Sequence, residues 1–212
     1  MLCPMKSYGE HCPVARALDV VGDRWALLVL RELELGPRRF TDLIDGLPGV
    51  GTNVLSARLR GLEAAGVIAK RTLPAPTRVT VYEATEAGRA IGPVLESLRD
   101  WGQAYGRPAA RDDAVRASWM LKRLIRRPPQ LAPGRVCELR VGDEVFAIRS
   151  DRASLTILGG GAERPDAVVT LGLGDLHALV SGAATARAVG ARADIDGDAQ
   201  TARQLLGSLA SG

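Results

Sequence analysis

A short amphipathic helix followed directly by a basic hairpin is the feature that most limits how this chain can fold. In the segment Thr52–Ala65, the apolar residues Leu55, Leu59 and Leu62 fall at i, i+4 and i+7 and form one stripe that would face a core. The opposite side carries short polar and basic residues, which can approach base edges without steric obstruction. These are Asn53, Ser56, Ala57 and Arg60. Thr52 is a plausible N-cap, which leaves the first turn available to a phosphate or a base.

Two β-prone stretches with alternating character follow this helix, at Val67–Thr72 and Val79–Ala84. The residues between them include Pro74 and Pro76, which cannot donate to a β-ladder, so we expect a hairpin tip there. The cations that flank the tip are Lys70, Arg71 and Arg78. A helix followed by a basic hairpin is typical of a winged helix-turn-helix, in which the helix enters the major groove and the wing touches the sugar-phosphate backbone.

Further helices are predicted before and after this pair. Apolar runs at Val14–Val21, Trp25–Leu35 and Phe40–Leu47 precede it, and glycine-proline pairs end the second and third runs. Residues 85–105 predict a last helix, in which Pro93 indicates a kink or a new first turn. Its apolar stripe would pack on its own core or on a second subunit. The stripe consists of Ile91, Leu95, Leu98, Gly102 and Tyr105, with Trp101 beside it.

Several segments share their order and spacing with one known family. They are 12–14 (Cys-Pro-Val), 17–25 (Ala-Leu-Asp-Val-Val-Gly-Asp-Arg-Trp), 39–43 (Arg-Phe-Thr-Asp-Leu), 55–62 (Leu-Ser-Ala-Arg-Leu-Arg-Gly-Leu), 66–68 (Gly-Val-Ile) and 82–88 (Tyr-Glu-Ala-Thr-Glu-Ala-Gly). Through them, about half of the chain resembles the HxlR-type family of bacterial winged-helix transcriptional regulators. The resemblance implies a homodimer on a pseudo-palindromic, double-stranded DNA operator. It also implies that the Val14–Val21 and Ile91–Tyr105 helices form the dimer contact.

On this basis the sequence yields two sets of expected DNA contacts. The residues expected to contact bases are Thr52, Asn53, Ser56 and Arg60. The residues expected to hold phosphates are Arg38, Arg39, Arg58, Lys70, Arg71 and Arg78. The positions of these residues matter more than the total charge of +4. Residues 1–106 contribute +1, residues 107–130 contribute +5 and residues 131–212 contribute −2, so the excess positive charge lies outside the predicted winged helix.

The second half follows a basic segment, 107–130, that is expected to be a linker containing one amphipathic helix. The apolar side of that helix would carry Val115, Trp119, Leu121, Leu124 and Ile125, and its basic side Arg116, Lys122 and Arg123. Either a solvated surface helix or a phosphate contact beside the winged helix fits this pattern. We therefore expect three parts: a winged-helix domain at 1–106, the linker, and a second domain at 131–212.

The second domain is predicted to be an α+β sandwich, because strands come first and covering helices follow. The strands are expected at Val136–Val141, Glu144–Ser150, Ala153–Leu158, Ala167–Leu171 and around Ala193–Ile195, and the helices at Leu173–Val180 and Ala199–Leu209. Segments 165–171, 175–182 and 190–198 are similar to the sterol-carrier-protein-like lipid-binding fold. That similarity implies an apolar tunnel for a fatty-acyl, sterol or polyketide-like effector. A carrier or sequestering protein for such a metabolite is the alternative function.

Cys12 resembles an N-terminal cysteine that some HxlR-type regulators use as a thiol sensor, which makes a redox-sensing regulator another alternative. Packing at the dimer contact is the other role open to Cys12. Cys3 and Cys137 are expected to be buried or incidental. An odd number of widely spaced cysteines suits a reducing compartment better than a disulfide framework.

The sequence predicts no metal site, no cofactor and no catalytic activity. His11 and His177, the only histidines, lack partners at metal-ligand spacing. Asp194, Asp196 and Asp198 alternate, but no glutamate follows at the spacing of a calcium loop, so we expect them to end a strand and cap a helix. The sequence has neither a nucleophile elbow nor a carboxylate pair in an acid-base context, so it gives no indication of an enzyme. No apolar run approaches the length of a spanning helix, which predicts a cytoplasmic protein without a membrane partner.

Overall fold

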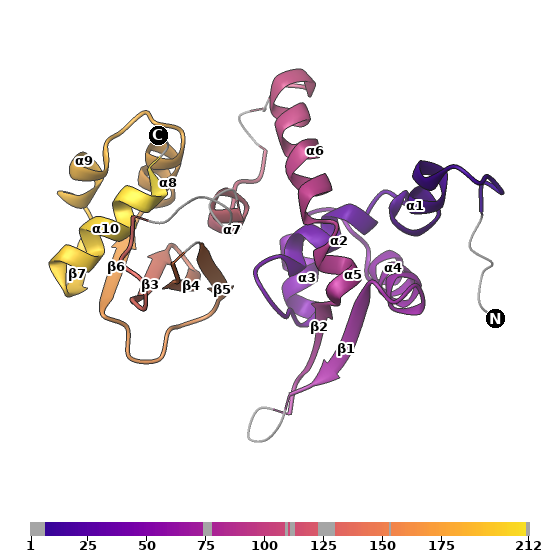
Figure 1. The fold of residues 1–212 in the computed structure, drawn as a ribbon, viewed down its shortest axis with the longest axis horizontal. Helices are drawn as coiled ribbons and strands as arrows, with labels where there is room; N and C mark the ends of the chain where they lie inside the picture. The colour runs from indigo at the N-terminus through magenta and orange to yellow at the C-terminus, as the bar shows by residue number, and fades with distance from the viewer. Residues whose placement is uncertain are drawn as a thin grey trace. The chain divides into compact units, whose positions relative to one another are not determined.

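A computed structural model describes residues 7–73, 78–108, 110, 113–122, 130–152 and 154–210 (Figure 1). The chain divides into two compact units, Met1–Asp112 and Asp113–Gly212. The division falls inside the segment 107–130, where the sequence predicts a linker.

Unit 1 is a set of helices with one projecting hairpin (Figure 1). Its elements are α1 (Pro13–Val21), α2 (Ala26–Leu33), α3 (Phe40–Gly46), α4 (Thr52–Ala64), β1 (Ile68–Thr72), β2 (Thr80–Ala84), α5 (Glu86–Arg89) and α6 (Gly92–Tyr105). The stripe predicted on α4 is confirmed, because Leu55, Leu59 and Leu62 are all fully buried in the core of this unit. Each would therefore leave a cavity if it were shortened.

The hairpin is a regular antiparallel pair that runs from Ile68 opposite Ala84 to Thr72 opposite Thr80. Arg38, in the turn between α2 and α3, extends this sheet by one bridge. Its N–H donates to the Tyr82 carbonyl at 2.9 Å, and the Tyr82 N–H donates back at 2.7 Å. The middle of β2 is thus hydrogen-bonded to the turn between α2 and α3. The predicted proline tip, residues 74–77, lies outside the described residues.

Two helix starts differ from or refine the prediction. Thr52 is not the N-cap of α4: Gly51 occupies that position, with an extended backbone and no side-chain cap, and Thr52 is already helical. The helix expected over 85–105 is divided into α5 and α6, and Pro93 lies in the first turn of α6. Proline fits there because its missing N–H would have no partner within the helix. Ile91 therefore precedes α6, which begins at Gly92.

Unit 2 is a mixed α+β structure built on one five-stranded sheet (Figure 1). Its elements are α7 (Ala117–Leu121), β3 (Val136–Val141), β4 (Glu144–Ser150), β5 (Leu155–Gly159), β6 (Ala167–Leu171), α8 (Leu173–Val180), α9 (Ala186–Gly190), β7 (Asp194–Gly197) and α10 (Ala199–Leu209). The strand order is β5-β4-β3-β6-β7, and β3 and β6 are the parallel pair. Short helix α9 was not predicted; the Thr185 side chain caps it by accepting from the Ala188 N–H at 3.2 Å.

One face of this sheet forms the core of unit 2. The register pairs Leu139 of β3 with Phe146 of β4 and Val169 of β6, and all three side chains are buried. Helix α10 packs against β3, β6 and β7. Its N-terminus is capped by Asp198, which accepts from the Gln200 N–H at 2.8 Å, so the predicted helix cap is confirmed. The helix cap therefore agrees with the sequence pattern, whereas in β3 and β4 the residues between the core positions, Glu138 and Ala147, are buried as well.

The helix predicted inside the linker is only partly correct. Val115, expected on the apolar side, is exposed, whereas Lys122, expected on the basic side, is buried. Helix α7 is held by Glu144 of β4, whose carboxylate accepts from the Ala117 N–H at 2.7 Å. Residues 117–122 are thus built into unit 2, because a strand side chain supplies the helix cap. Arg123, Leu124 and Ile125 lie outside the described residues.

The part of the chain that the structure describes lacks two kinds of feature. Every helix in that part of the chain is too short or too polar to cross a membrane. Across the same residues, histidine, cysteine and acidic side chains form no group of three that could hold a metal ion.

Candidate nucleic-acid interface

Helix α4 presents a polar strip on the side opposite its buried leucines. Thr52, Asn53 and Arg60 are exposed and Ser56 is half-buried, so all four residues expected to contact bases lie at the surface of one helix. Val54 is also exposed, in the first turn of the same helix. Val54 was not predicted as a contact residue, although its position next to Leu55, about 100° around the helix, places it outside the buried stripe.

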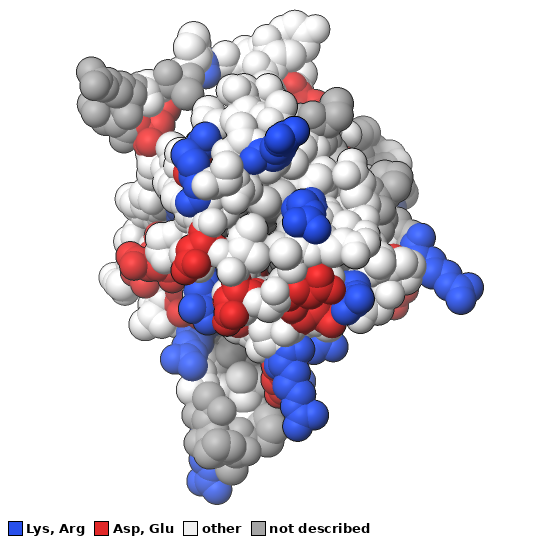
Figure 2. Space-filling model, turned by 90° about the vertical axis from the view of Figure 1, so that its left-hand side faces the viewer, with Lys and Arg blue, Asp and Glu red and all other residues white. Residues whose placement is uncertain are grey.

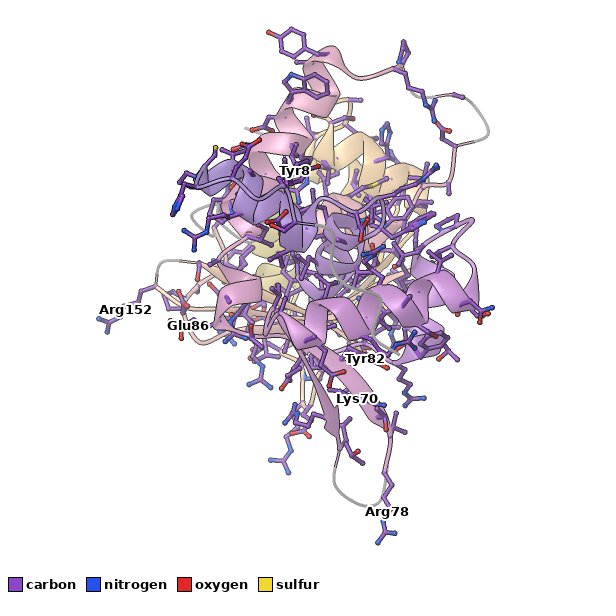
Figure 3. The ribbon with its side chains drawn as sticks, turned by 90° about the vertical axis from the view of Figure 1, so that its right-hand side faces the viewer. Tyr8, Lys70, Arg78, Tyr82, Glu86 and Arg152 are labelled. Atoms are coloured by element: carbon purple, nitrogen blue, oxygen red, sulfur yellow. The ribbon has the colours of Figure 1, made fainter. Side chains whose placement is uncertain are left out.

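The three cations of the hairpin are exposed but have different surroundings (Figure 3). Arg78 lies at the far end of the hairpin with its side chain directed away from it. The Lys70 ammonium is 5.9 Å from the centre of the Tyr82 ring, which is a cation–π distance. Arg71 forms an ion pair with Glu83 across the two strands at 3.1 Å. A phosphate would therefore compete with Glu83 for Arg71.

Arg38 and Arg39 are neighbours in sequence but differ in accessibility. Arg39 is exposed at the N-terminus of α3, where its backbone N–H donates to the Asp42 carboxylate at 2.9 Å. Its side chain is not used in that cap. Arg38 is half-buried, and its Nε lies 3.5 Å from the Glu32 carbonyl in addition to the backbone bridge with Tyr82. Arg39 is therefore the better placed of the two to reach a phosphate.

Arg58, the remaining cation expected to hold a phosphate, is directed toward another part of unit 1. Its Nη1 donates to the Asp23 carboxylate in the turn between α1 and α2. The Arg58 side chain is 23% exposed, against 62% for Asp23. Burial lowers the pKa of the Arg58 guanidinium. Four of the six expected phosphate ligands are therefore exposed, while Arg38 and Arg58 are engaged within the unit.

Net charge alone does not outline this interface, because residues 1–106 contribute only +1. Basic and acidic side chains are also mixed on the surface of unit 2, which Figure 2 shows. Such mixing is ordinary for a protein surface, since both signs are normally interspersed. The candidate nucleic-acid surface therefore consists of the individual side chains that project from α4 and the hairpin.

Helices α1 and α6 of unit 1 each expose several apolar side chains. On α6, Leu95 packs into the core, whereas Trp101 and Tyr105 are exposed with their ring centres 6.0 Å apart. The further exposed apolar residues are Val14 and Leu18 on α1 and Val94 and Leu98 on α6. Single exposed apolar side chains are normal, but groups of them on one element indicate an interaction surface.

The two described cysteines have opposite environments. Cys12 is exposed at the N-cap of α1, where hydrogen bonds from the backbone N–H groups of Ala15 and Val14 lower the pKa of its thiol. Cys137 is buried in β3, and burial raises the pKa of its thiol to about 12. Cys3 lies outside the described residues. Cys12 therefore combines exposure with a stabilised thiolate, and Cys137 has neither property.

The first half of the chain is similar to known regulators. Residues 20–110 match the family model described as HxlR-like helix-turn-helix. The HTH-type transcriptional regulator sll1512 of Synechocystis is 42% identical over 103 residues, which are 48% of this chain and 76% of that protein. YvaP of Bacillus subtilis, also described as an HTH-type transcriptional regulator, is 33% identical over 105 residues, which are 49% of this chain and 96% of that protein. The solved structure of the reduced transcriptional regulator YodB from B. subtilis has 27% identity and a TM-score of 0.42, covering 48% of this chain and 100% of that one.

The contrast between Cys12 and Cys137 predicts selective alkylation of the folded chain. In a Cys3→Ser variant treated with iodoacetamide, Cys12 should react with a pH midpoint below the value of about 8.5 for a free thiol, because its pKa is lowered. Cys137 should stay unmodified from pH 7 to 9. Mass spectrometry of the peptides measures both rates, and the urea-unfolded chain, in which the two should react alike, is the control. Equal rates in the folded chain would contradict the assignment.

Proposed function

Because the chain belongs to the HxlR-type family of helix-turn-helix transcriptional regulators through its first 110 residues, we propose that it binds a pseudo-palindromic operator with α4 and the β1–β2 hairpin. One observation supports this most directly: α4 buries its leucine stripe and presents Asn53 and Arg60 on the opposite side. Asparagine can bind adenine, and arginine can bind guanine, through two hydrogen bonds each. Thr52 and Ser56 complete the proposed base contacts.

Phosphate contacts are proposed for the exposed cations around this helix. Arg39 lies at the start of α3, and Lys70, Arg71 and Arg78 lie on the hairpin. Contacts of this kind fix the register of a protein on the duplex and carry no sequence information themselves. They also release counterions, so affinity should fall steeply with salt. A pure carrier protein would lack that salt dependence, which separates the regulator from the alternative function.

The two kinds of contact predict different effects of two arginine substitutions. Arg60→Ala should cost about 1–3 kcal/mol and relax selectivity, if Arg60 binds a base through two hydrogen bonds. Arg78→Ala should weaken binding to all sequences alike and reduce the salt slope by about 1. The measurement is fluorescence anisotropy with a duplex selected from a random pool by the wild-type chain, compared with a scrambled duplex. Unchanged affinity and selectivity in Arg60→Ala would remove Arg60 from the interface.

We further propose that the chain acts as a homodimer through the apolar residues of α1 and α6. The family of helix-turn-helix regulators implies DNA binding by dimers, because two half-sites one turn apart are read by two copies. The exposed Leu98, Trp101 and Tyr105 supply the apolar area on α6, and Val14 and Leu18 supply it on α1. Burying this surface against a second copy would remove it from water.

A charge placed in the proposed contact should separate the two copies. Leu98→Glu is expected to give a monomer in analytical ultracentrifugation, because a carboxylate in an apolar contact loses its hydration. Leu158→Glu on β5 is the matched control, since Leu158 is 42% exposed and Leu98 is 45% exposed. The control should remain dimeric. A dimeric Leu98→Glu variant would place the contact elsewhere.

For unit 2 we propose binding of an apolar effector. The buried apolar side of its sheet lies under α10. The sequence segments 165–171, 175–182 and 190–198 resemble the sterol-carrier-protein-like fold. A guest can regulate DNA binding only if its affinity differs between the DNA-competent and incompetent states. Thiol regulation through Cys12 is a second candidate, supported by the exposure and lowered pKa of this thiol. The alkylation experiment tests its first requirement.

Effector control predicts reciprocal coupling between the guest and DNA. Operator affinity should change when the chain is saturated with palmitic acid, a sterol or a polyketide, and DNA should change the affinity for that guest by the same factor. Binding of each lipophile is followed by intrinsic tryptophan fluorescence, and DNA binding by anisotropy. A saturated chain whose DNA affinity is unchanged would show that unit 2 takes no part in regulation.

A further inference from the structure

We propose that Arg58 positions helix α4 through its ion pair with Asp23 and does not hold a phosphate, an inference that rests on the proposed DNA-binding function. Arg58 belongs to α4 but differs from the other cation of that helix. Arg60 lies on the side opposite the leucine stripe, whereas Arg58 is turned toward the corner between α1 and α2. The two arginines of one helix thus have separate tasks.

Burial of the guanidinium argues against a phosphate contact. Arg58 Nε has no access to solvent and no hydrogen-bond partner among the described residues. Arginine binds phosphate best with two parallel N–H groups, so the pair that includes Nε is closed to DNA. Nη1 is already donated to Asp23. The side chain as a whole is 23% exposed, which leaves little of it for an additional ligand.

The position of Asp23 argues in the same direction. Its carboxylate is 62% exposed and stands beside the guanidinium. A phosphate that approached Arg58 would meet this carboxylate at short range, and two anions repel each other. The local charge is therefore already balanced. Binding of a phosphate would require the ion pair to open, with the half-buried cation moving toward solvent.

The ion pair joins two parts of unit 1 that have different proposed roles. Asp23 follows α1, the helix that exposes Val14 and Leu18 at the proposed dimer contact. Arg58 lies in the middle of α4, and α1 also packs against α4. A dimer binds two half-sites about 34–36 Å apart. Small rotations of α4 relative to α1 would therefore change how well the two copies of α4 match the spacing of the half-sites. The Asp23–Arg58 pair holds that relation fixed.

A double-mutant cycle on DNA affinity tests this role. The variants are Asp23→Ala, Arg58→Met, which keeps the apolar stem, and the two combined. The probe is a fluorescent duplex selected from a random pool by the wild-type chain, titrated at several KCl concentrations. Each single substitution should weaken DNA binding about 5- to 30-fold. The double variant should bind DNA at least as tightly as the single variant with the lower affinity. The salt slope should stay at the wild-type value, because no phosphate contact is lost.

Arg60→Met on the same helix is the matched control. It should change selectivity, and its effect should add to that of Asp23→Ala, because Asp23 is paired with Arg58. Thermal unfolding of every variant verifies the fold. Should Arg58→Met fail to fold, the charge-reversed pair Asp23→Arg with Arg58→Glu provides the second test. That pair should bind DNA more tightly than Arg58→Glu alone.

Two results would overturn the proposal. A phosphate contact predicts that Arg58→Met lowers the salt slope by about 1. It also predicts that Asp23→Ala leaves binding unchanged or tightens it, because the competing carboxylate is gone. Absence of salt-dependent DNA binding by the wild-type chain is a different result, since it would refute the proposed function before any variant is compared.

Discussion

The burial of three leucines on α4 is the interaction on which the rest of the proposed interface depends. Leu55, Leu59 and Leu62 are fully enclosed, and burying a leucine side chain contributes roughly 1.5–3 kcal/mol. Successive helical residues are turned by about 100°, so this anchorage fixes the direction of every other side chain on α4. Asn53 and Arg60 point outward because the leucines point inward. In the proposed interface, packing inside unit 1 therefore determines which side chains of α4 face the DNA.

What could be predicted from the sequence followed from local periodicity. The stripe on α4, the strands of both units and the Asp198 cap depend on residues close together in the chain, and all are present. Pairings between distant residues could not be predicted, because no local pattern encodes them. Arg38 bridges to Tyr82, and Arg58 pairs with Asp23. Both arginines have the residue type of a phosphate ligand, but tertiary contacts engage them inside the fold.

Net charge is a weak indicator of the DNA-binding surface, because it does not account for tertiary contacts that enclose individual cations. The segment 107–130 has a charge of +5, whereas the first 106 residues have only +1. Yet part of that basic segment is built into unit 2, since Lys122 is buried and Glu144 caps α7. A count of charges treats all cations as equally available. Accessibility distinguishes Arg39 and Arg78, which are exposed, from Arg38 and Lys122, which the fold encloses wholly or in part.

Regulation by the proposed effector requires coupling between the two units, which the chain joins between α6 and α7. At one end, α6 exposes Leu98, Trp101 and Tyr105, the residues of the proposed dimer contact. At the other end, Glu144 fixes α7 to β4 through the Ala117 N–H. A guest within unit 2 can influence the operator only by changing the free energy of the dimer arrangement that DNA requires.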